Sequence, residues 1–481
     1  MRHLVWFRSD LRVDDNTALI EAADRATGGV VGLYVVSPGD FARHDWAACR
    51  VDFVLRNLAA LSASLERLRI PLLIRTATRW QEVPAAVLAV AREHGCYAAH
   101  WNREHEVNEA ARDARARRLL EEATCAVYEY NDQTVIPPGD LRTQGGKPYT
   151  VFTPFKRAWM ARLGRDASWE PRPAPKPCPA MVCPPDPVPA VVPGWESPVD
   201  AALWPAGEAA AEARLGWFTA RAIGPYKEKR DLPGTDGTSR LSPYLASGVI
   251  SPRRCLRAGM EANGGRSDGG LDGPAHWVSE LVWREFYKHV LASFPRVCKG
   301  RAFKPEAESV PWRDDPAGLA AWRAGRTGYP IVDAAMRQLH TTGWMHNRLR
   351  MIAAMFLTKD LLIDWRHGER FFMQRLVDGD LASNNGGWQW SASTGTDAAP
   401  YFRIYNPTTQ SQRYDPAGAF IRAWVPELRG LSDDEIHEPG RVGPLRRSGL
   451  DYPEPIVDHA AARARALAAF GARDEGEHAG A

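Results

Sequence analysis

The sequence of 481 residues has few cysteines and lacks the features of several large protein classes. Its seven cysteines are scattered without a CxxC pair, which speaks against a disulfide framework and against a zinc module. No run approaches the roughly 18 consecutive apolar residues of a membrane span. Residues 1–15 turn quickly to charge, unlike a signal peptide. We therefore expect a protein of the cytoplasm that has no membrane partner.

Common nucleotide and hydrolase motifs are also missing, although the first part of the chain has the pattern of an α/β domain. There is no GxGxxG after a strand, no GxxxxGK[ST] and no GxSxG, which speaks against a nicotinamide site, a P-loop and an α/β-hydrolase. Short apolar runs alternate with helical patterns, of which 49–69 is the most regular. This alternation predicts a doubly wound, parallel, five-stranded sheet. The strands are expected at 3–7, 30–36, 71–75, 97–101 and 125–130.

Proline marks the end of this pattern. Residues 171–205 hold 12 of the 37 prolines, too many for a regular helix or sheet, so we expect an extended connector. The pattern that follows predicts helices at 207–222, 251–262, 275–293, 316–324, 330–341, 344–357, 369–376 and 416–428. The predicted domains are an α/β domain at 1–130, a connector at 131–206, an all-α domain at 207–470 and a frayed tail at 471–481.

Tryptophan is present in surplus. The sequence has 18 Trp against 15 Phe and 13 Tyr, and eleven of the tryptophans follow residue 200. Residues 240–425 also carry 24 basic and 17 acidic side chains, a net charge of +7 in a chain whose total is +3. Basic charge with interleaved aromatic rings is typical of nucleic-acid binding, through phosphate attraction and base stacking. A solvated basic surface is the alternative.

Two patterns in this half have the residue types of a binding site. GTSRLSPYLASG (237–248) places hydroxyls, a glycine and an arginine before a helix, which suits a phosphate; the alternative is a plain N-cap by Ser242. Two predicted helices each carry a face that mixes charged, amide, indole and thioether groups, namely Trp277, Glu280 and Arg284 on one and Asn347, Arg350 and Met351 on the other. The alternative for these faces is exposure to solvent with intrahelical Glu–Arg pairing.

A third segment, 376–410, is the richest in polar and aromatic groups. Asp378 and Asp380 are followed by two asparagines, two glycines and two tryptophans. On a helix, Trp388 and Trp390 would point about 200° apart, so they would serve different surfaces. A metal site is the competing interpretation of the carboxylates, but no ligand spacing supports it and we expect no metal.

These segments resemble a known family. Three segments are similar to the DNA photolyase/cryptochrome family, specifically its bacterial class I cyclobutane pyrimidine dimer photolyases. They are residues 376–410, TGYPIVDAAMRQLHTTGWMHNRLRMIAAMFLTKDLLIDWRHGERFF (327–372) and VWFRSDLRVDDNTAL (5–19). The similarity runs from residue 3 to about 470. It implies FAD in the all-α domain, active as the reduced anion, and an antenna of the 5,10-methenyltetrahydrofolate type in the α/β domain. One departure is HEPG (437–440), where the family commonly has an aromatic residue after the proline.

The matching positions imply which residues bind the two chromophores. The 238–242 turn and Arg284 would meet the FAD pyrophosphate, and Asn384 would lie beside flavin N5. Asp378 would pair with Arg350. The full set expected at FAD is Tyr226, Thr238, Ser239, Arg240, Leu241, Ser242, Trp277, Arg284, Asn347, Arg350, Asp378, Gly379, Asp380 and Asn384. The set expected at the antenna is His44, Asn108, Glu109, Cys298 and Lys299.

The resemblance also implies a lesion face and an electron path. Trp283 and Trp390 would flank a dimer flipped out of the DNA stack, as is known of photolyases. The residues expected at DNA or lesion are Arg230, Glu280, Trp283, Tyr287, Asn347, Arg348, Trp390, Arg403 and Gln410. Those expected to act in repair are Glu280, Asn347, Met351 and Asn384. Electrons would reach the flavin through Trp388, Trp365 and Trp312.

The expected function is light-driven repair of cyclobutane pyrimidine dimers, a carbon–carbon lyase reaction on UV-damaged DNA by a monomer without an obligate protein partner. The alternatives are a cryptochrome-type photoreceptor, a photolyase of (6-4) photoproducts, and a flavin protein with only structural affinity for DNA. Asn384 and the short tail speak against a receptor. Asn347 and Met351, where (6-4) enzymes use histidines, speak against the second alternative.

Overall fold

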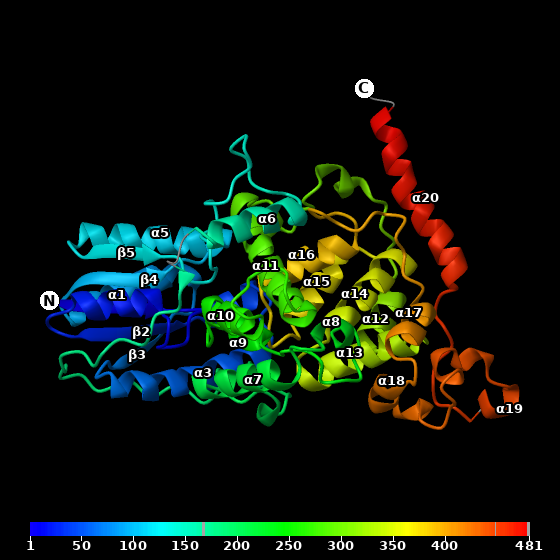
Figure 1. Ribbon diagram of the computed structural model, residues 1–481, viewed down its shortest axis with the longest axis horizontal. Coiled ribbons are helices and arrows are strands. Elements are labelled where there is room, and N and C mark those ends of the chain that lie inside the picture. The colour runs from blue at the N-terminus through cyan, green and yellow to red at the C-terminus, as the bar shows by residue number, and fades with distance from the viewer. Residues whose placement is uncertain (166–168, 448, 479–481) are drawn as a thin grey trace. The chain divides into compact units, whose positions relative to one another are not determined.

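A computed structural model describes residues 1–165, 169–447 and 449–478, and its chain divides into two compact units (Figure 1). The first unit comprises Met1–Tyr226, Ser239–Pro295 and Val377–Asp380. The second comprises Lys227–Thr238, Arg296–Leu376 and Leu381–Ala481. The first helices predicted for the all-α domain, from 207 to 293, thus belong to the unit that holds the sheet. The predicted domain boundaries at 130 and 206 stay predictions.

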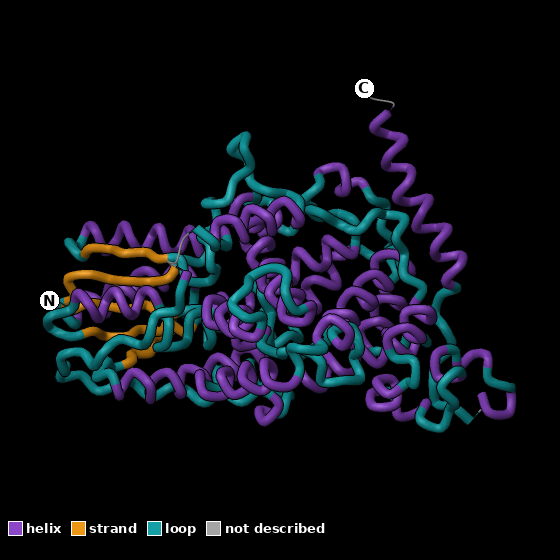
Figure 2. The backbone as a smooth tube through the Cα atoms, viewed as in Figure 1, coloured by secondary structure: helices purple, strands orange, loops and turns teal. Residues whose placement is uncertain are grey.

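The sheet of the first unit has five parallel strands in the order β3-β2-β1-β4-β5 (Figure 2). The chain runs from the central strand β1 to one edge and then from β4 to the other, which is the predicted doubly wound arrangement. The strands are Arg2–Phe7 (β1), Val30–Val36 (β2), Leu72–Thr76 (β3), Cys96–Asn102 (β4) and Ala126–Tyr130 (β5). Each of the five predicted strands is therefore confirmed to within one residue at its ends.

Helices of the first unit cover the sheet and extend beyond it. Leu4, Trp6 and Leu33 pack against Val87 and Leu120 in one apolar cluster, which explains why the strands are almost continuously apolar. The helices that flank the strands are α1 (Thr17–Arg25), α2 (Pro38–Arg43), α3 (Ala48–Arg67), α4 (Val83–Glu93) and α5 (Val107–Glu122), with a 3-10 turn η1 (Trp80–Glu82). The others are α6 (Phe152–Leu163), α7 (Glu208–Arg221), α9 (Ser242–Ala246), α10 (Pro252–Ala262) and α11 (Asp272–Ser293). Helix α8 (Tyr226–Lys229) has its first residue in the first unit and the others in the second.

The proline-rich connector has the irregular backbone that its composition predicts. Within 171–205 the only regular element of the described chain is a 3-10 turn, η3 (Ala201–Leu203). The sequence analysis missed α6, which lies inside the segment assigned to the connector. Its signal was a stripe of large apolar residues at helical spacing, all of them buried: Phe152, Phe155, Trp159 and Leu163.

The second unit is built from helices around one large apolar cluster, which includes Trp322, Trp365 and Trp388. Its helices are α12 (Pro316–Ala324), α13 (Pro330–Thr342), α14 (Asn347–Met355), α15 (Trp365–Met373), α16 (Leu381–Ser391), α17 (Pro407–Tyr414), α18 (Ala419–Trp424), α19 (Pro444–Arg447) and α20 (His459–His478). Short turns complete it: η4 (Val297–Lys299), η5 (Pro305–Ser309), a π-helix η6 (Phe356–Asp360), η7 (Pro426–Leu428), η8 (Glu435–His437) and η9 (Pro439–Arg441).

The chain end differs from the expectation of a frayed tail at 471–481. Helix α20 continues to His478, and residues 479–481 lie outside the described residues. Nowhere in the described ranges is there a helix with the length and apolar character to cross a membrane.

Candidate functional site

Helix α11 and the end of α7 bring two of the predicted flavin residues together in the first unit. The ring of Phe218 on α7 lies 5.0 Å from the ring of Trp277 and 5.6 Å from that of Tyr226. Gly259 of α10 makes room for this indole, because a Cβ there would lie 3.1 Å from two of its ring carbons. Tyr226 and Trp277 thus share one buried aromatic cluster.

Arg284 is also on α11, one turn beyond the predicted lesion residue Glu280. Its guanidinium donates to the backbone carbonyls of Gln133, at 2.7 Å, and Leu245, at 3.4 Å. Arg284 is thus held by two backbone carbonyls of the first unit. The buried side-chain oxygen of Gln133 has no hydrogen-bond partner among the described residues.

The 238–242 turn has a strained backbone. Arg240 has a φ of +51°, in the left-handed region that non-glycine residues rarely adopt and that clusters at functional sites. Leu241 is the N-cap of α9 and makes no side-chain cap bond, and Ser242 is the first residue of the helix. The alternative in which Ser242 is a plain N-cap is therefore wrong. Ser239 and the residues after it belong to the first unit, and Thr238 to the second.

A buried lysine holds one of the two predicted flavin carboxylates. Asp378, Gly379 and Asp380 belong to the first unit. Lys288 of α11 is 3% exposed, and its Nζ lies 2.6 Å from Asp380 and 3.4 Å from Glu106. Burial lowers the pKa of this lysine, but the Asp380 and Glu106 carboxylates outweigh burial and raise it. Sequence reasoning missed Lys288, since nothing in its spacing distinguishes it from a solvated lysine.

Three of the five predicted antenna residues meet in the first unit. His44 follows α2, and its ring nitrogens lie 2.9 Å from the Asn108 amide nitrogen and 3.1 Å from a Glu109 oxygen. Burial lowers the pKa of His44, but Glu109 outweighs this effect and raises it. Cys298 and Lys299 are in η4 of the second unit.

Arg50 on α3 is a polar group near this site that the sequence analysis did not single out. Its side chain is buried, and its guanidinium lies 3.6 Å over the ring of Trp46. Its Nε is wholly buried and has no hydrogen-bond partner among the described residues. Burial lowers the pKa of Arg50, while Asp380, Glu104 and Glu106 oppose this effect. A buried Nε with no acceptor points to a group that the chain itself does not supply.

Helix α14 of the second unit has the two faces that the sequence predicts. Leu349, Ile352 and Ala353 are buried, whereas Asn347 is exposed. Arg350 and Met351 are half-buried on the same side as Asn347, and Arg350 donates to the carbonyl of Met345 at 2.8 Å. The predicted pairing of Asp378 with Arg350 stays a prediction.

Two of the predicted DNA-contacting arginines meet at one carboxylate. Arg348 donates to both oxygens of Asp231, at 3.3 and 2.8 Å, and Arg230 lies 3.9 Å from the same residue. Arg403 is exposed before α17, and Gln410 is half-buried on that helix. The structure therefore groups Arg230 with Arg348 in the second unit.

Helix α16 separates its two tryptophans as helical geometry predicts. Trp388 is buried and Trp390 is half-buried. Gly368 of α15 is needed for the first of these rings, because a Cβ there would lie 2.1 Å from the Trp388 indole. The Asn384 amide nitrogen donates to the carbonyl of Glu369 at 2.9 Å.

The three tryptophans of the predicted electron path share one hydrophobic region of the second unit. Trp388 and Trp365 are buried in the large cluster, and Trp312 packs against it. Trp312 also meets the ring of Phe470 on α20 at 5.7 Å. A further indole, Trp322, lies 6.0 Å from Trp388 and was not expected to take part.

The donor set in each unit fits FAD. Arg240, Arg284 and the 238–242 hydroxyls suit a diphosphate, and the buried Gln133 oxygen, which has no partner among the described residues, can accept from an N–H or O–H group of the cofactor. Over the described ranges there is no group of His, Cys, Asp and Glu side chains arranged to hold a metal.

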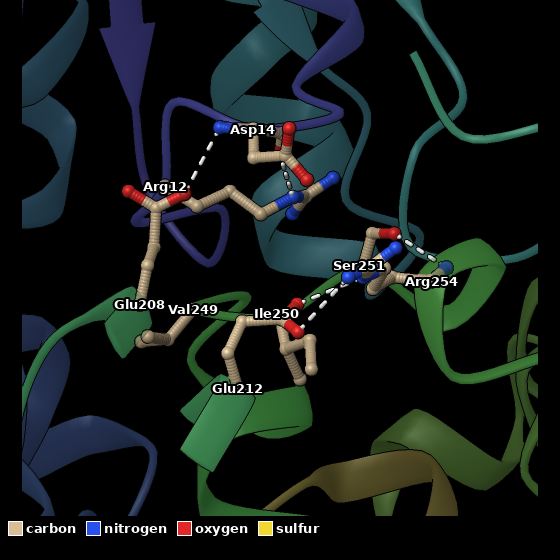
Figure 3. Close-up of a pocket in the computed structure, with 8 residues that line it drawn as sticks. All are labelled: Arg12, Asp14, Glu208, Glu212, Val249, Ile250, Ser251 and Arg254. Carbon is tan, nitrogen blue, oxygen red and sulfur yellow. Dashed lines mark hydrogen bonds and ion pairs between the residues drawn. The ribbon is translucent and has the colours of Figure 1, made fainter. Parts of the chain in front are cut away.

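A separate cavity of about 280 Å³ is polar but internally paired (Figure 3). Glu212 takes two hydrogen bonds from Arg254, at 3.0 and 3.2 Å, and Glu208 accepts from the backbone of Asp14 at 2.9 Å. Its charged groups are thus used within the protein. We assign it no ligand.

Comparison with known proteins agrees with this geometry. Residues 3–179 match the family model described as DNA photolyase, and residues 277–472 match the FAD binding domain of DNA photolyase. The chain is 46% identical over 476 residues to the deoxyribodipyrimidine photo-lyase of Escherichia coli K12, covering 99% of each chain. A bacterial class III photolyase from Agrobacterium tumefaciens is 37% identical with a TM-score of 0.88 over 98% of each chain. A cryptochrome from Synechocystis has 28% identity and a TM-score of 0.86, over 97% of this chain and 99% of its own. The chain belongs to the DNA photolyase and cryptochrome family.

Proposed function

We propose that this protein is a deoxyribodipyrimidine photo-lyase that repairs cyclobutane pyrimidine dimers in UV-damaged DNA. The observation that carries the proposal is helix α11. One side of it presents Glu280, Trp283 and Tyr287 at intervals of three and four residues, and the same helix provides the flavin residues Trp277 and Arg284. Likeness over the full chain to enzymes of that name supports the same reaction.

The lesion residues bind the DNA and the dimer by stacking and by hydrogen bonds. Trp283 and Trp390 offer flat rings to the dimer, each able to contribute about 1–3 kcal/mol of stacking. Glu280 holds a pyrimidine by hydrogen bonding, and Asn347 and Met351 complete the wall. Arg230, Arg348, Arg403 and Gln410 hold the DNA backbone and read no sequence. Tyr287 lies beside Trp283 on the same helix.

The flavin residues orient the cofactor. Bound reduced FAD supplies, on excitation by light, the electron that opens the cyclobutane ring and is then returned, so no reductant is consumed. Arg240, Arg284 and the hydroxyls of 238–242 hold the diphosphate. Asn384, held by its hydrogen bond to the Glu369 carbonyl, directs its side-chain oxygen to the flavin, and Asp380 is kept in place by Lys288.

The decisive experiment is light-dependent repair. Under blue light and with reduced FAD, cyclobutane dimers should disappear from an irradiated oligonucleotide, whereas a (6-4) photoproduct in a matched oligonucleotide should persist. Persistence of the cyclobutane dimers would refute the proposed function, and loss of the (6-4) product alone would assign the alternative one.

We also infer a folate-type antenna, 5,10-methenyltetrahydrofolate, held by His44, Asn108, Glu109, Cys298 and Lys299. The contacts of His44 with its two neighbours support this inference. Arg50 adds a planar cationic donor whose charge is felt by Glu106, the N-cap of the helix that carries Asn108 and Glu109. A ring carbonyl of the chromophore would satisfy it.

Arg50→Met should weaken binding of 5,10-methenyltetrahydrofolate by about tenfold or more, because hydrogen bonds to charged groups contribute about 1.5–3 kcal/mol. The measurement is a titration of the folate absorption band into FAD-containing enzyme. Arg67→Met, at an exposed position of the same helix, is the matched control. Equal affinity in the two variants would contradict the role given to Arg50.

The cellular setting is inferred from chemistry. All seven cysteines are free, which suits the reducing cytoplasm. One chain carries every proposed role, so we propose that it acts as a monomer. Antenna binding is assigned to 1–130 and FAD and DNA binding to 207–470, with 131–206 as the connector.

A further inference from the structure

The predicted lesion indole Trp283 already has one of its faces covered by another aromatic ring. The rings of Trp283 and Phe152 are stacked, with centroids 3.6 Å apart and planes inclined by 7°. Aromatic pairs in proteins more often meet at 4.5–7 Å in offset or edge-on arrangements. Trp283 is nonetheless only half-buried, so part of its surface remains open.

Phe152 is itself fixed by its neighbours. It is the first residue of α6 and is buried, and its ring lies 5.9 Å from that of Phe286 on α11. Two further contacts tie α6 to α11 along the following turns. The Phe155 ring lies 5.2 Å from the Phe286 ring, and the Trp159 indole nitrogen donates to Glu285 at 2.6 Å.

Two further aromatic rings lie near the Trp283 indole. Phe286 meets it at 5.7 Å with an interplanar angle of 79°, and Tyr287 meets it at 5.7 Å with an angle of 34°. With one face stacked and two further aromatic neighbours, rotation of the indole about its side-chain bonds would break several contacts. The ring is thus set in one orientation before any ligand arrives, which lowers the entropy lost on binding.

We propose that Phe152 is a positioning residue for lesion recognition, which backs Trp283 so that an extruded pyrimidine dimer stacks only on the uncovered face of the indole. This proposal rests on the proposed function. Phe152 acts through Trp283 and does not touch the lesion. Its effect is confined to recognition of the dimer, because undamaged DNA is held through its backbone.

The test is binding in the dark by the FAD-containing enzyme, with an oligonucleotide that carries one cyclobutane thymine dimer and with its undamaged counterpart. Phe152→Ala should weaken binding of the damaged oligonucleotide by about 5–20-fold, a fraction of a stacking contribution. Binding of the undamaged one should stay unchanged. Phe152→Tyr keeps the flat ring and should restore the affinity. Val151→Ala, at the exposed preceding residue, is the matched control.

A double-mutant cycle with Trp283→Ala separates positioning from general packing. In the Trp283→Ala background, the further change Phe152→Ala should have no effect on dimer affinity. Fully additive losses would overturn the proposal, as would equal losses for damaged and undamaged DNA. The repair yield per bound dimer, measured at saturating enzyme, should also be unchanged in Phe152→Ala.

Two further measurements test the proposal, one on a second variant and one on the wild-type enzyme. If Phe152→Ala does not fold, Phe152→Leu fills the same space without a flat face and should show the same selective loss; wild-type affinity in that variant would overturn the proposal. Wild-type enzyme that does not distinguish damaged from undamaged DNA would instead refute the lesion-binding function on which the proposal rests.

Discussion

Trp388→Phe should abolish the light-driven reduction of oxidised FAD while leaving repair by enzyme reduced beforehand unchanged. Indole can give up an electron at an accessible potential, and a phenyl ring cannot. Trp388 is buried in the apolar cluster that also contains Trp365 and that Trp312 packs against. Removing the first of these indoles should therefore disconnect the flavin from the other two.

The measurement is the absorbance change of oxidised FAD under blue light with an external thiol reductant, followed by a repair assay on dithionite-reduced enzyme. Trp322→Phe is the matched control. Its ring is equally buried and lies 6.0 Å from that of Trp388, but it is not part of the proposed path. Loss of photoreduction in Trp322→Phe with retention in Trp388→Phe would move the path to the other tryptophan. Equal loss of photoreduction and repair in Trp388→Phe would show that the indole serves the flavin site in general.

The contrast between Trp388 and Trp322 also shows how far the tryptophan surplus could guide prediction. The surplus pointed to the second half of the chain, where the proposed roles lie. Yet Trp322, like Trp6, Trp101 and Trp159, is wholly buried, and its burial gives it a structural reason to be there. Composition alone cannot separate a redox indole from a packing indole. The separation came from resemblance to a family.

The sheet was predictable because its signal is local. Five apolar runs bounded by polar segments define five strands, and their alternation with helices predicts that the strands are parallel. Helix α6 has an equally local stripe, but proline-rich sequence follows it, and the whole stretch was assigned to a connector. The missed helix carries Phe152. Because the helix was assigned to the connector, the sequence analysis did not single out this residue at the proposed lesion face.

Buried charges could not be predicted from the sequence. Lys288 and Arg50 belong to residue types that are mostly exposed, and only the folded chain shows what surrounds them. Lys288 finds Asp380 in a segment about 90 residues away. A pair between residues far apart in the chain has no periodic sequence pattern that would predict it, unlike the i, i+4 pairs within a helix.

Asp132→Asn should destabilise the first unit by about 3–5 kcal/mol, because it removes the carboxylate that pairs with the buried Arg12 and that shares the buried Arg253 with Asp15. Asp132 follows β5 and is almost wholly buried. One of its oxygens accepts from Arg12, and the other lies 2.8 Å from a nitrogen of Arg253. Arg253 also donates to Asp15 at 2.9 Å, so the cluster joins the sheet to α10.

The contribution of this cluster to the stability of the fold depends on pH in one direction. Burial opposes ionisation of Asp132, but Arg12 and Arg253 outweigh it and lower its pKa to about 2. The usual Asp pKa is about 3.9. Because the folded state binds this proton less readily than the unfolded state, the carboxylate stabilises the fold above about pH 4. That contribution is lost as the pH falls through about 2.

Urea unfolding followed by tryptophan fluorescence should show a lower midpoint for Asp132→Asn at pH 7, and the gap to the wild type should narrow between pH 4 and pH 2. The asparagine keeps the shape and cannot titrate, which is why the narrowing reports the carboxylate itself. Asp24→Asn is the control, since Asp24 lies 3.5 Å from Arg172 but is 65% exposed. An exposed pair of this kind contributes about 0–1 kcal/mol. Equal midpoints for the two variants at pH 7 would mean that the two arginines are stabilised by other groups, and that Asp132 does not hold the sheet to α10.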